Sequence, residues 1–125
     1  MDFELEELRA IDGDLELIAR KAARYSFPTI TVLDDHMYLN LYFVQLLGDV
    51  DYLSFGASSS YIVLKPANKA SSTAFKLSRP KNFNGRIIII PANLKEKKLA
   101  KGVYKIYKFG DGFAFKRYER LEDRQ

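Results

Sequence analysis

The chain has 125 residues, a length that suits one domain with a buried core. An apolar fraction of 47% and an aromatic fraction of 14% are typical of a globular protein rather than a disordered one. The absence of cysteine excludes disulfides and thiolate metal sites, and no apolar run approaches the roughly 20 residues of a membrane span. Because the acidic N-terminus is also unlike a signal peptide, we expect a cytoplasmic protein that does not contact the membrane.

The net charge of +4 is unevenly distributed along the chain. Residues 1–25 and residues 26–68 each carry a net charge of −3. Residues 69–125 carry 15 basic and 5 acidic side chains, a net charge of +10. Such asymmetry indicates a polyanionic partner for the C-terminal half, the alternative being an uneven surface that is merely solvated.

Residues 1–27 are predicted to form an N-terminal helical segment. Leu5, Leu8 and Ile11 recur at helical spacing before an Asp-Gly pair interrupts the pattern. The Asp-Gly pair could instead be the turn of a hairpin. An amphipathic helix most often packs on its own domain. Here it is also a candidate surface for a protein partner, or an acidic cover for the basic half.

The following segment, residues 28–68, predicts two strands, a short helix and two further strands. The strands are expected at 30–33, 37–40, 50–55 and 61–65, and the helix at 41–47. An acidic turn, Asp34-Asp35-His36, joins the first two strands, and Gly48 ends the helix.

Residues 73–120 repeat this order with a longer first turn. The strands are expected at 74–77, 86–90, 103–109 and 113–118, and the helix at 92–99. Val50 corresponds to Val103 and Tyr61 to Phe113, so the copies lie 53 or 52 residues apart. We therefore predict one mainly β (α+β) domain over residues 28–122, built from two β-β-α-β-β repeats.

The second copy resembles the DNA-binding unit of the AbrB-type transition-state regulators. Its sequence over 84–118 is NGRIIIIPANLKEKKLAKGVYKIYKFGDGFAFKRY. Gly85-Arg86 opens a short apolar strand, Pro91 closes it, and a helix with basic residues follows at Leu94-Lys95. The resemblance implies a swapped-hairpin β-barrel, and the tandem of two units is similar to that of MraZ proteins.

Four consecutive isoleucines occupy positions 87–90. A strand with β-branched residues at every position is typical of burial on both faces, as in a closed or interleaved barrel. We expect these isoleucines to be core, with the flanking charges projecting from the end of the barrel.

Basic residues are concentrated between Lys69 and Lys101, where Glu96 is the only acidic residue. Arginine and lysine contact phosphates, and arginine can also bond guanine through two hydrogen bonds. The predicted nucleic-acid-binding residues lie in the loop before residue 86 and in the following helix. They are Lys76, Arg79, Lys81, Asn82, Asn84, Arg86, Lys95, Lys97 and Lys98.

Aromatic and basic residues alternate between positions 104 and 118. On an exposed sheet this pattern could be a stacking platform for single-stranded nucleic acid. It is also the pattern of half-buried strands with aromatic residues inward, which we favour. For Phe83, packing on the barrel end is favoured over insertion at a base step.

Catalysis finds little support in the sequence. His36 is the only histidine, no cysteine can act as nucleophile, and no pattern supplies three convergent metal ligands. We therefore predict a protein that is not an enzyme and needs no cofactor.

The sequence as a whole favours a small DNA-binding transcriptional regulator that contacts duplex DNA and can form a homo-oligomer. One alternative is a protein-interaction module, such as a phage or mobile-element accessory protein, which the acidic first repeat favours. Another is a binder of RNA or single strands on the same scaffold. A steep dependence of affinity on salt separates nucleic-acid binding from protein binding.

Overall fold

The structure, a computed structural model, describes residues 6–7, 25–69, 71–81 and 84–123. The first half contains β2 (Thr29–Val32), β3 (His36–Leu39), α1 (Leu41–Leu47), β4 (Tyr52–Ala57) and β5 (Tyr61–Ala67). The second half contains β6 (Phe75–Lys76), β7 (Arg86–Ile89), α2 (Ala92–Glu96), β8 (Gly102–Lys105), β9 (Tyr107–Phe109) and β10 (Gly112–Lys116). Two further strands are β1 (Glu6–Glu7) and β11 (Arg120–Asp123).

These elements follow the order expected for each half, with three differences. The expected strand at 103–109 is two strands, because the chain passes from one sheet to the other at Ile106. The helix α2 ends at Glu96 instead of Leu99. Glu6 and Glu7 pair with β9 as a strand instead of lying in a helix, and residues 25–27 are not helical. The rest of the expected N-terminal helical segment, residues 1–5 and 8–24, lies outside the described residues.

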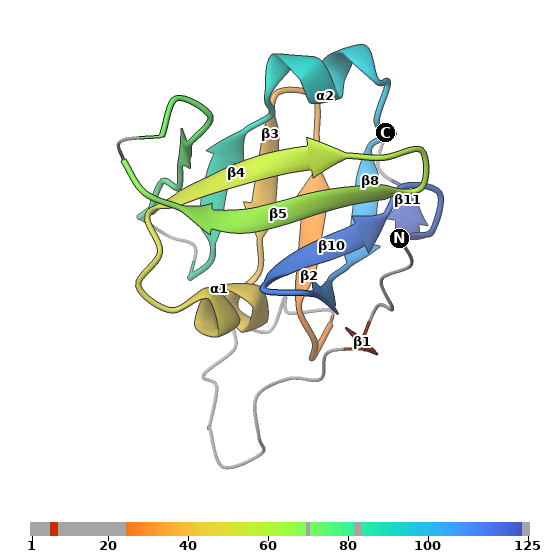
Figure 1. Ribbon diagram of the computed structural model, residues 1–125. Helices are drawn as coiled ribbons and strands as arrows, with labels where there is room; N and C mark the ends of the chain where they lie inside the picture. The colour runs from red at the N-terminus through yellow and green to blue at the C-terminus, as the bar shows by residue number, and fades with distance from the viewer. Residues whose placement is uncertain (1–5, 8–24, 70, 82–83, 124–125) are drawn as a thin grey trace.

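The strands form two antiparallel sheets, so the fold is mainly β (Figure 1). The first sheet has the order β1-β9-β10-β5-β4-β6, and the second has the order β11-β8-β2-β3-β7. The β2–β3 hairpin of the first half lies between β8 and β7 of the second half. Likewise, β5 and β4 lie between β10 and β6. The two halves are therefore interleaved and share both sheets.

The registers between the halves follow a nearly constant shift in residue number. His36 of β3 pairs with Ile89 of β7, and Leu39 pairs with Arg86. If each residue of β3 is matched to the residue 50 positions later, His36 corresponds to Arg86 and Leu39 corresponds to Ile89. The two pairs are therefore equivalent to each other. A shift of 52 residues relates β5 to β10 in the same way. Each half thus occupies equivalent positions in the sheets, which is the pattern of an approximate two-fold axis.

The two sheets do not close into a barrel, in contrast to the expectation from the resemblance. Only Phe75 and Lys76 of β6 pair with β4. One isolated bridge, between Ser78 and Ile87, then links this segment to the second sheet. The corresponding ladder of the first half, between β2 and β3, has three pairs. Closure therefore fails along the seam between β6 and β7.

The isoleucine run alternates between core and surface. Ile88 and Ile90 are buried, Ile87 is half-buried, and Ile89 is 63% exposed. The expected burial on both faces is wrong because the core covers only one face of the second sheet, so the outward residues of β7 face solvent. The run has the period of two that a strand with one covered face requires.

The core fills the space between the sheets, and each end receives a helix. Figure 1 shows α1 below the sheets and α2 above them. Phe43 of α1 and Leu94 of α2 are fully buried in this core. Burying side chains of this size stabilises the fold by about 2 kcal/mol each. Each half thus contributes one helix to one end of the shared core.

Asn40 joins three backbone groups at the start of α1. Its side-chain oxygen accepts from the N–H of Phe43 at 3.0 Å and from the N–H of Thr29 at 3.1 Å. Its amide nitrogen donates to the carbonyl of Phe27 at 2.9 Å. The first bond is a helix N-cap, and the other two hold β2 beside the end of β3.

We expect Asn40→Ala to lower the free energy of unfolding by about 2 to 4 kcal/mol, because it removes the cap and leaves buried backbone groups unpaired. Urea unfolding followed by circular dichroism measures this loss. Asn93→Ala is the matched control, since Asn93 is exposed in α2. It should change stability by less than about 0.5 kcal/mol. Equal effects of the two substitutions would contradict the role given to Asn40.

Candidate nucleic-acid interface

The predicted binding residues form two groups at opposite ends of β7. The loop at 78–85 leads into β7 at Arg86, and α2 follows beyond Pro91. Five residues of extended chain span about 17 Å. The structure therefore brings Arg79, Lys81, Asn84 and Arg86 to one end, and Lys95, Lys97 and Lys98 to the other. Asn82 and Phe83 lie outside the described residues.

The loop at 78–85 is fixed at both of its ends. Ser78 and Ile87 exchange two backbone hydrogen bonds, at 2.7 and 3.0 Å. Arg79 lies 3.5 Å from the carboxylate of Asp51, with both side chains 63% exposed. Lys81 and Asn84 are exposed. The side chains of Arg79, Lys81 and Asn84 are thus presented to solvent on a segment anchored to the second sheet.

Arg86 stands where the loop enters β7. Its guanidinium donates to the carbonyl of Gly85 at 2.8 Å, and the residue is half-buried. Burial lowers the pKa of Arg86, and the positive charge of Arg79 lowers it further, against an opposing effect of Asp51. Arginine nevertheless stays charged at neutral pH. Arg79 is therefore near enough for its charge to act on Arg86, although burial is the larger cause of the lowered pKa.

The group at α2 is partly neutralised by the first hairpin. Lys95 lies 3.0 Å from Asp35, and Lys101 lies 3.0 Å from Asp34. The acidic turn of the first half therefore faces the basic helix of the second half. Exposed ion pairs of this kind contribute only about 0 to 1 kcal/mol each, but they compensate charge that a polyanion would otherwise meet.

Lys97 and Lys98 follow the end of α2 and are exposed. Neither makes an ion pair within the part of the chain that the structure describes. They are the two members of the α2 group whose charge is left uncompensated by the described residues.

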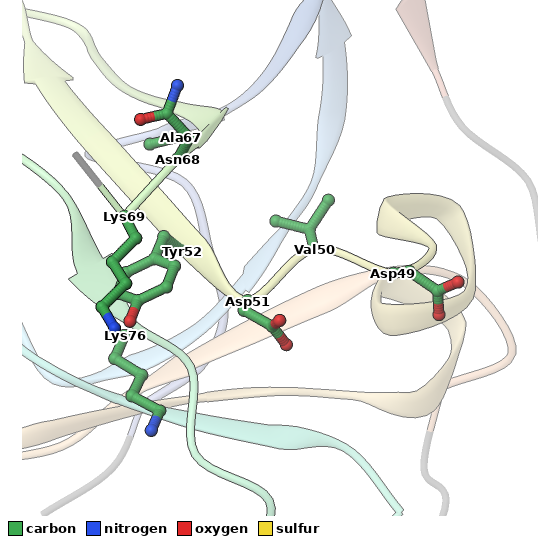
Figure 2. Close-up of a pocket in the computed structure, with 8 residues that line it drawn as sticks. All are labelled: Asp49, Val50, Asp51, Tyr52, Ala67, Asn68, Lys69 and Lys76. Atoms are coloured by element: carbon green, nitrogen blue, oxygen red, sulfur yellow. The ribbon is translucent and has the colours of Figure 1, made fainter. Parts of the chain in front are cut away.

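Lys76 lines an open depression of about 600 Å³, together with Asp51, the ion-pair partner of Arg79 (Figure 2). Figure 2 shows Lys76 and Lys69 beside the ring of Tyr52, with Asp51 and Asp49 on the other side. Two lysines and two aspartates give this depression no net charge. It is therefore a poorer site for phosphate than the loop at 78–85.

Most of the alternating aromatic residues belong to the core. Tyr104, Phe113 and Phe115 are buried, and burial raises the pKa of Tyr104. Tyr107 is half-buried, and Tyr118 is 78% exposed. The interpretation as half-buried strands is confirmed for the three buried rings, which cannot stack on bases.

The partners of the basic residues were not predicted from the sequence. Asp34, Asp35 and Asp51 belong to the first half, so their ion pairs depend on how the halves interleave. The opposite net charges of the two halves were the available signal for such compensation.

The described residues contain no group of three or more His, Cys, Asp or Glu side chains arranged to hold a metal ion. None of the described helices is long and apolar enough to cross a membrane.

The ion pair at Lys95 lowers the pKa of Asp35. The hydrogen bond from Lys95 is the largest cause, followed by its charge, and His36 adds a smaller contribution. A carboxyl whose pKa is lower in the folded state than in the unfolded state stabilises the fold at pH values above its ordinary pKa of 3.8. This stabilisation is lost as the pH falls through the lowered pKa of the folded state. The effect on stability is small because the group is fully exposed.

We expect the Asp35 carboxyl to titrate below 3.8 and to return toward that value in Lys95→Met, because the bonded cation is removed. Carbon-13 NMR of the carboxyl groups follows this titration. Lys97→Met is the control and should leave Asp35 unchanged, since Lys97 does not contact it. If the pKa of Asp35 is the same in the wild-type protein and in Lys95→Met, the ion pair does not form in solution.

Comparison of the chain with protein-family models, with curated proteins and with solved structures found no match.

Proposed function

We propose that this protein is a small regulator that binds duplex DNA through the loop at 78–85 and Arg86. The observation that carries the proposal is the set of basic side chains gathered there, with Arg79 and Lys81 exposed and Arg86 half-buried. Basic side chains close together on an exposed segment attract a polyanion. The repeated phosphates of nucleic acid are the anion that a row of exposed basic side chains fits best.

The chemistry of the loop suits both phosphates and base edges. Arg86 is half-buried and bonded to the carbonyl of Gly85, so its position is restricted before binding. Arg79 would exchange Asp51 for a phosphate, and exposed Lys81 would add a second charge contact. Asn84 could bond an adenine edge, as asparagine does in major grooves.

The α2 group would extend the contact along a duplex. At 3.4 Å per base pair, the 17 Å or so between the two groups corresponds to about five base pairs. Lys97 and Lys98 are exposed on that end, while Lys95 would have to release Asp35.

The interleaved strands support the resemblance to the AbrB-type regulators in a tandem, MraZ-like form. Each hairpin of one half is flanked by strands of the other half, as a swapped-hairpin arrangement requires. The closed barrel of that resemblance is not part of the proposal, because the seam between β6 and β7 is joined by one bridge.

A protein-interaction module is the second candidate. It is favoured by the ion pairs that compensate Arg79, Lys95 and Lys101, because a surface of mixed charge suits a protein partner better than a polyanion. Binding through the N-terminal segment, assembly into a homo-oligomer and the absence of enzymatic activity stay predictions from the sequence.

The test is fluorescence anisotropy of a labelled duplex at low salt with a loop variant that carries Arg79→Glu, Lys81→Glu and Arg86→Gln. We expect its affinity to fall at least about tenfold, because three phosphate or base contacts are lost or made repulsive. The control carries Lys65→Glu, Lys108→Glu and Lys105→Gln, which give the same change in net charge on β5, β9 and β8.

The control variant should retain most of the wild-type affinity. Equal losses in the two variants would show that only the net charge of the protein matters. Absence of duplex binding by the wild-type protein at low salt would refute DNA binding and leave the protein-interaction module as the working function.

A further inference from the structure

Three turns meet at the end of the molecule beyond α2, and Arg117 joins them. Its guanidinium donates to the carbonyl of Ser58 at 3.0 Å and to the carbonyl of Lys97 at 2.9 Å. Ser58 lies in the turn between β4 and β5, and Lys97 follows α2. Arg117 itself begins the turn between β10 and β11, so it fixes all three turns relative to one another. We call the surface formed by Lys97, Lys98, Arg117 and Tyr118 the Arg117 end.

Tyr118 is unusually exposed for an aromatic residue. The residue is 78% exposed, and the Arg117 guanidinium carbon lies 5.5 Å from the ring centre. A cation over the face of an aromatic ring is attracted to it, which restricts the motion of the ring. An exposed, oriented aromatic face flanked by basic residues is the arrangement on which proteins stack unpaired bases.

Lys98 occupies a backbone position that favours glycine. Its φ is +55°, and it directly follows Lys97, the C-cap of α2. At the end of α1, the C-cap residue Gly48 has a similar φ of +69°. Glycine adopts this conformation without the steric cost that a side chain carries. The second half therefore keeps a lysine where its own fold would be more stable with glycine.

The charges around these residues leave the lysines available to an anion. Glu119 beside Tyr118 is paired with Lys116 at 3.5 Å, and Glu96 is the acidic neighbour of Lys97 in the chain. Lys97 and Lys98 make no ion pair within the described residues. Two lysines without an ion pair among the described residues thus lie on the segment whose carbonyl Arg117 bonds, and Arg117 itself directly precedes the exposed Tyr118 in the chain.

We propose that the Arg117 end binds single-stranded nucleic acid, with an unpaired base stacked on Tyr118 and phosphates on Lys97 and Lys98. This inference does not depend on the loop at 78–85, which lies at the other end of β7. Base stacking explains the exposed ring, and phosphate binding explains the lysine at a glycine position. Recognition would be tolerant of sequence, because every base has a face that can stack.

The test measures binding of the full chain to fluorescent oligothymidine and oligouridine of about 12 nucleotides, a length within the usual site size. Tyr118→Ala should weaken binding about tenfold, because the stacked base loses its platform. Tyr118→Phe keeps the aromatic face and should bind within about twofold of wild type. Lys98→Gly should weaken binding several-fold while raising Tm by about 4 °C, since it removes a charge and relieves the backbone.

Loss of affinity in Tyr118→Ala and Lys98→Gly, with Tyr118→Phe unaffected, would support the proposal for whichever oligonucleotide binds. The rise in Tm ensures that the loss in Lys98→Gly is not caused by unfolding. Wild-type affinity in Tyr118→Ala, or no binding of either oligonucleotide at low salt, would overturn it.

The loop variant described above separates this site from the duplex surface. It should lose duplex binding and keep single-strand binding. If it loses single-strand binding as strongly as Tyr118→Ala does, the single strand binds at the loop and the assignment to the Arg117 end is wrong.

Discussion

The pairing of β3 with β7 is the constraint on which the remaining structure depends. It joins the second strand of each half in one antiparallel ladder, and β5 and β10 repeat this relation in the other sheet. Neither half has a sheet of its own, so the core forms only when both halves are in place. The same pairing puts the start of β7 beside the end of β3 and places the two helices at opposite ends of the core.

This arrangement also determines where charge is compensated. Because β3 and β7 run antiparallel, the turn before β3 lies beside the residues after β7. Asp34 and Asp35 therefore face Lys101 and Lys95, while Asp51 reaches Arg79 at the other end. The strong positive charge of the C-terminal half is thus reduced within the chain. Among the described residues, the basic side chains that make no ion pair include Lys81 and Arg86 beside the loop at 78–85 and Lys97 and Lys98 after α2.

Local patterns predicted most of the elements. The helix α1 has the predicted bounds, and Gly110 and Asp111, between the strands expected at 103–109 and 113–118, form the turn that joins β9 to β10. The duplication was also visible, because turns and apolar runs recur with similar spacing in both halves. These features depend on neighbouring residues, which a sequence displays directly.

Features that depend on contacts between distant segments were not predicted. The exposure of Ile89 follows from the core covering only one face of the second sheet, and the single bridge at Ser78 follows from the register of β6. The separation of the predicted site into two groups follows from β7 lying between them. The role of Asn40 was not predicted either, because its hydrogen bonds to Thr29 and Phe27 form only when β2 lies beside the end of β3.

The central claim, that an electropositive loop binds duplex DNA, is tested most directly by the dependence of the duplex dissociation constant on salt. If three or four phosphates are neutralised, the logarithm of the association constant falls with the logarithm of salt concentration with a slope of about −3 to −4, so the dissociation constant rises roughly 100-fold between 50 and 200 mM. The account predicts this slope for the wild-type protein on duplexes of unrelated sequence. A slope near zero, or no binding at 50 mM salt, would contradict it.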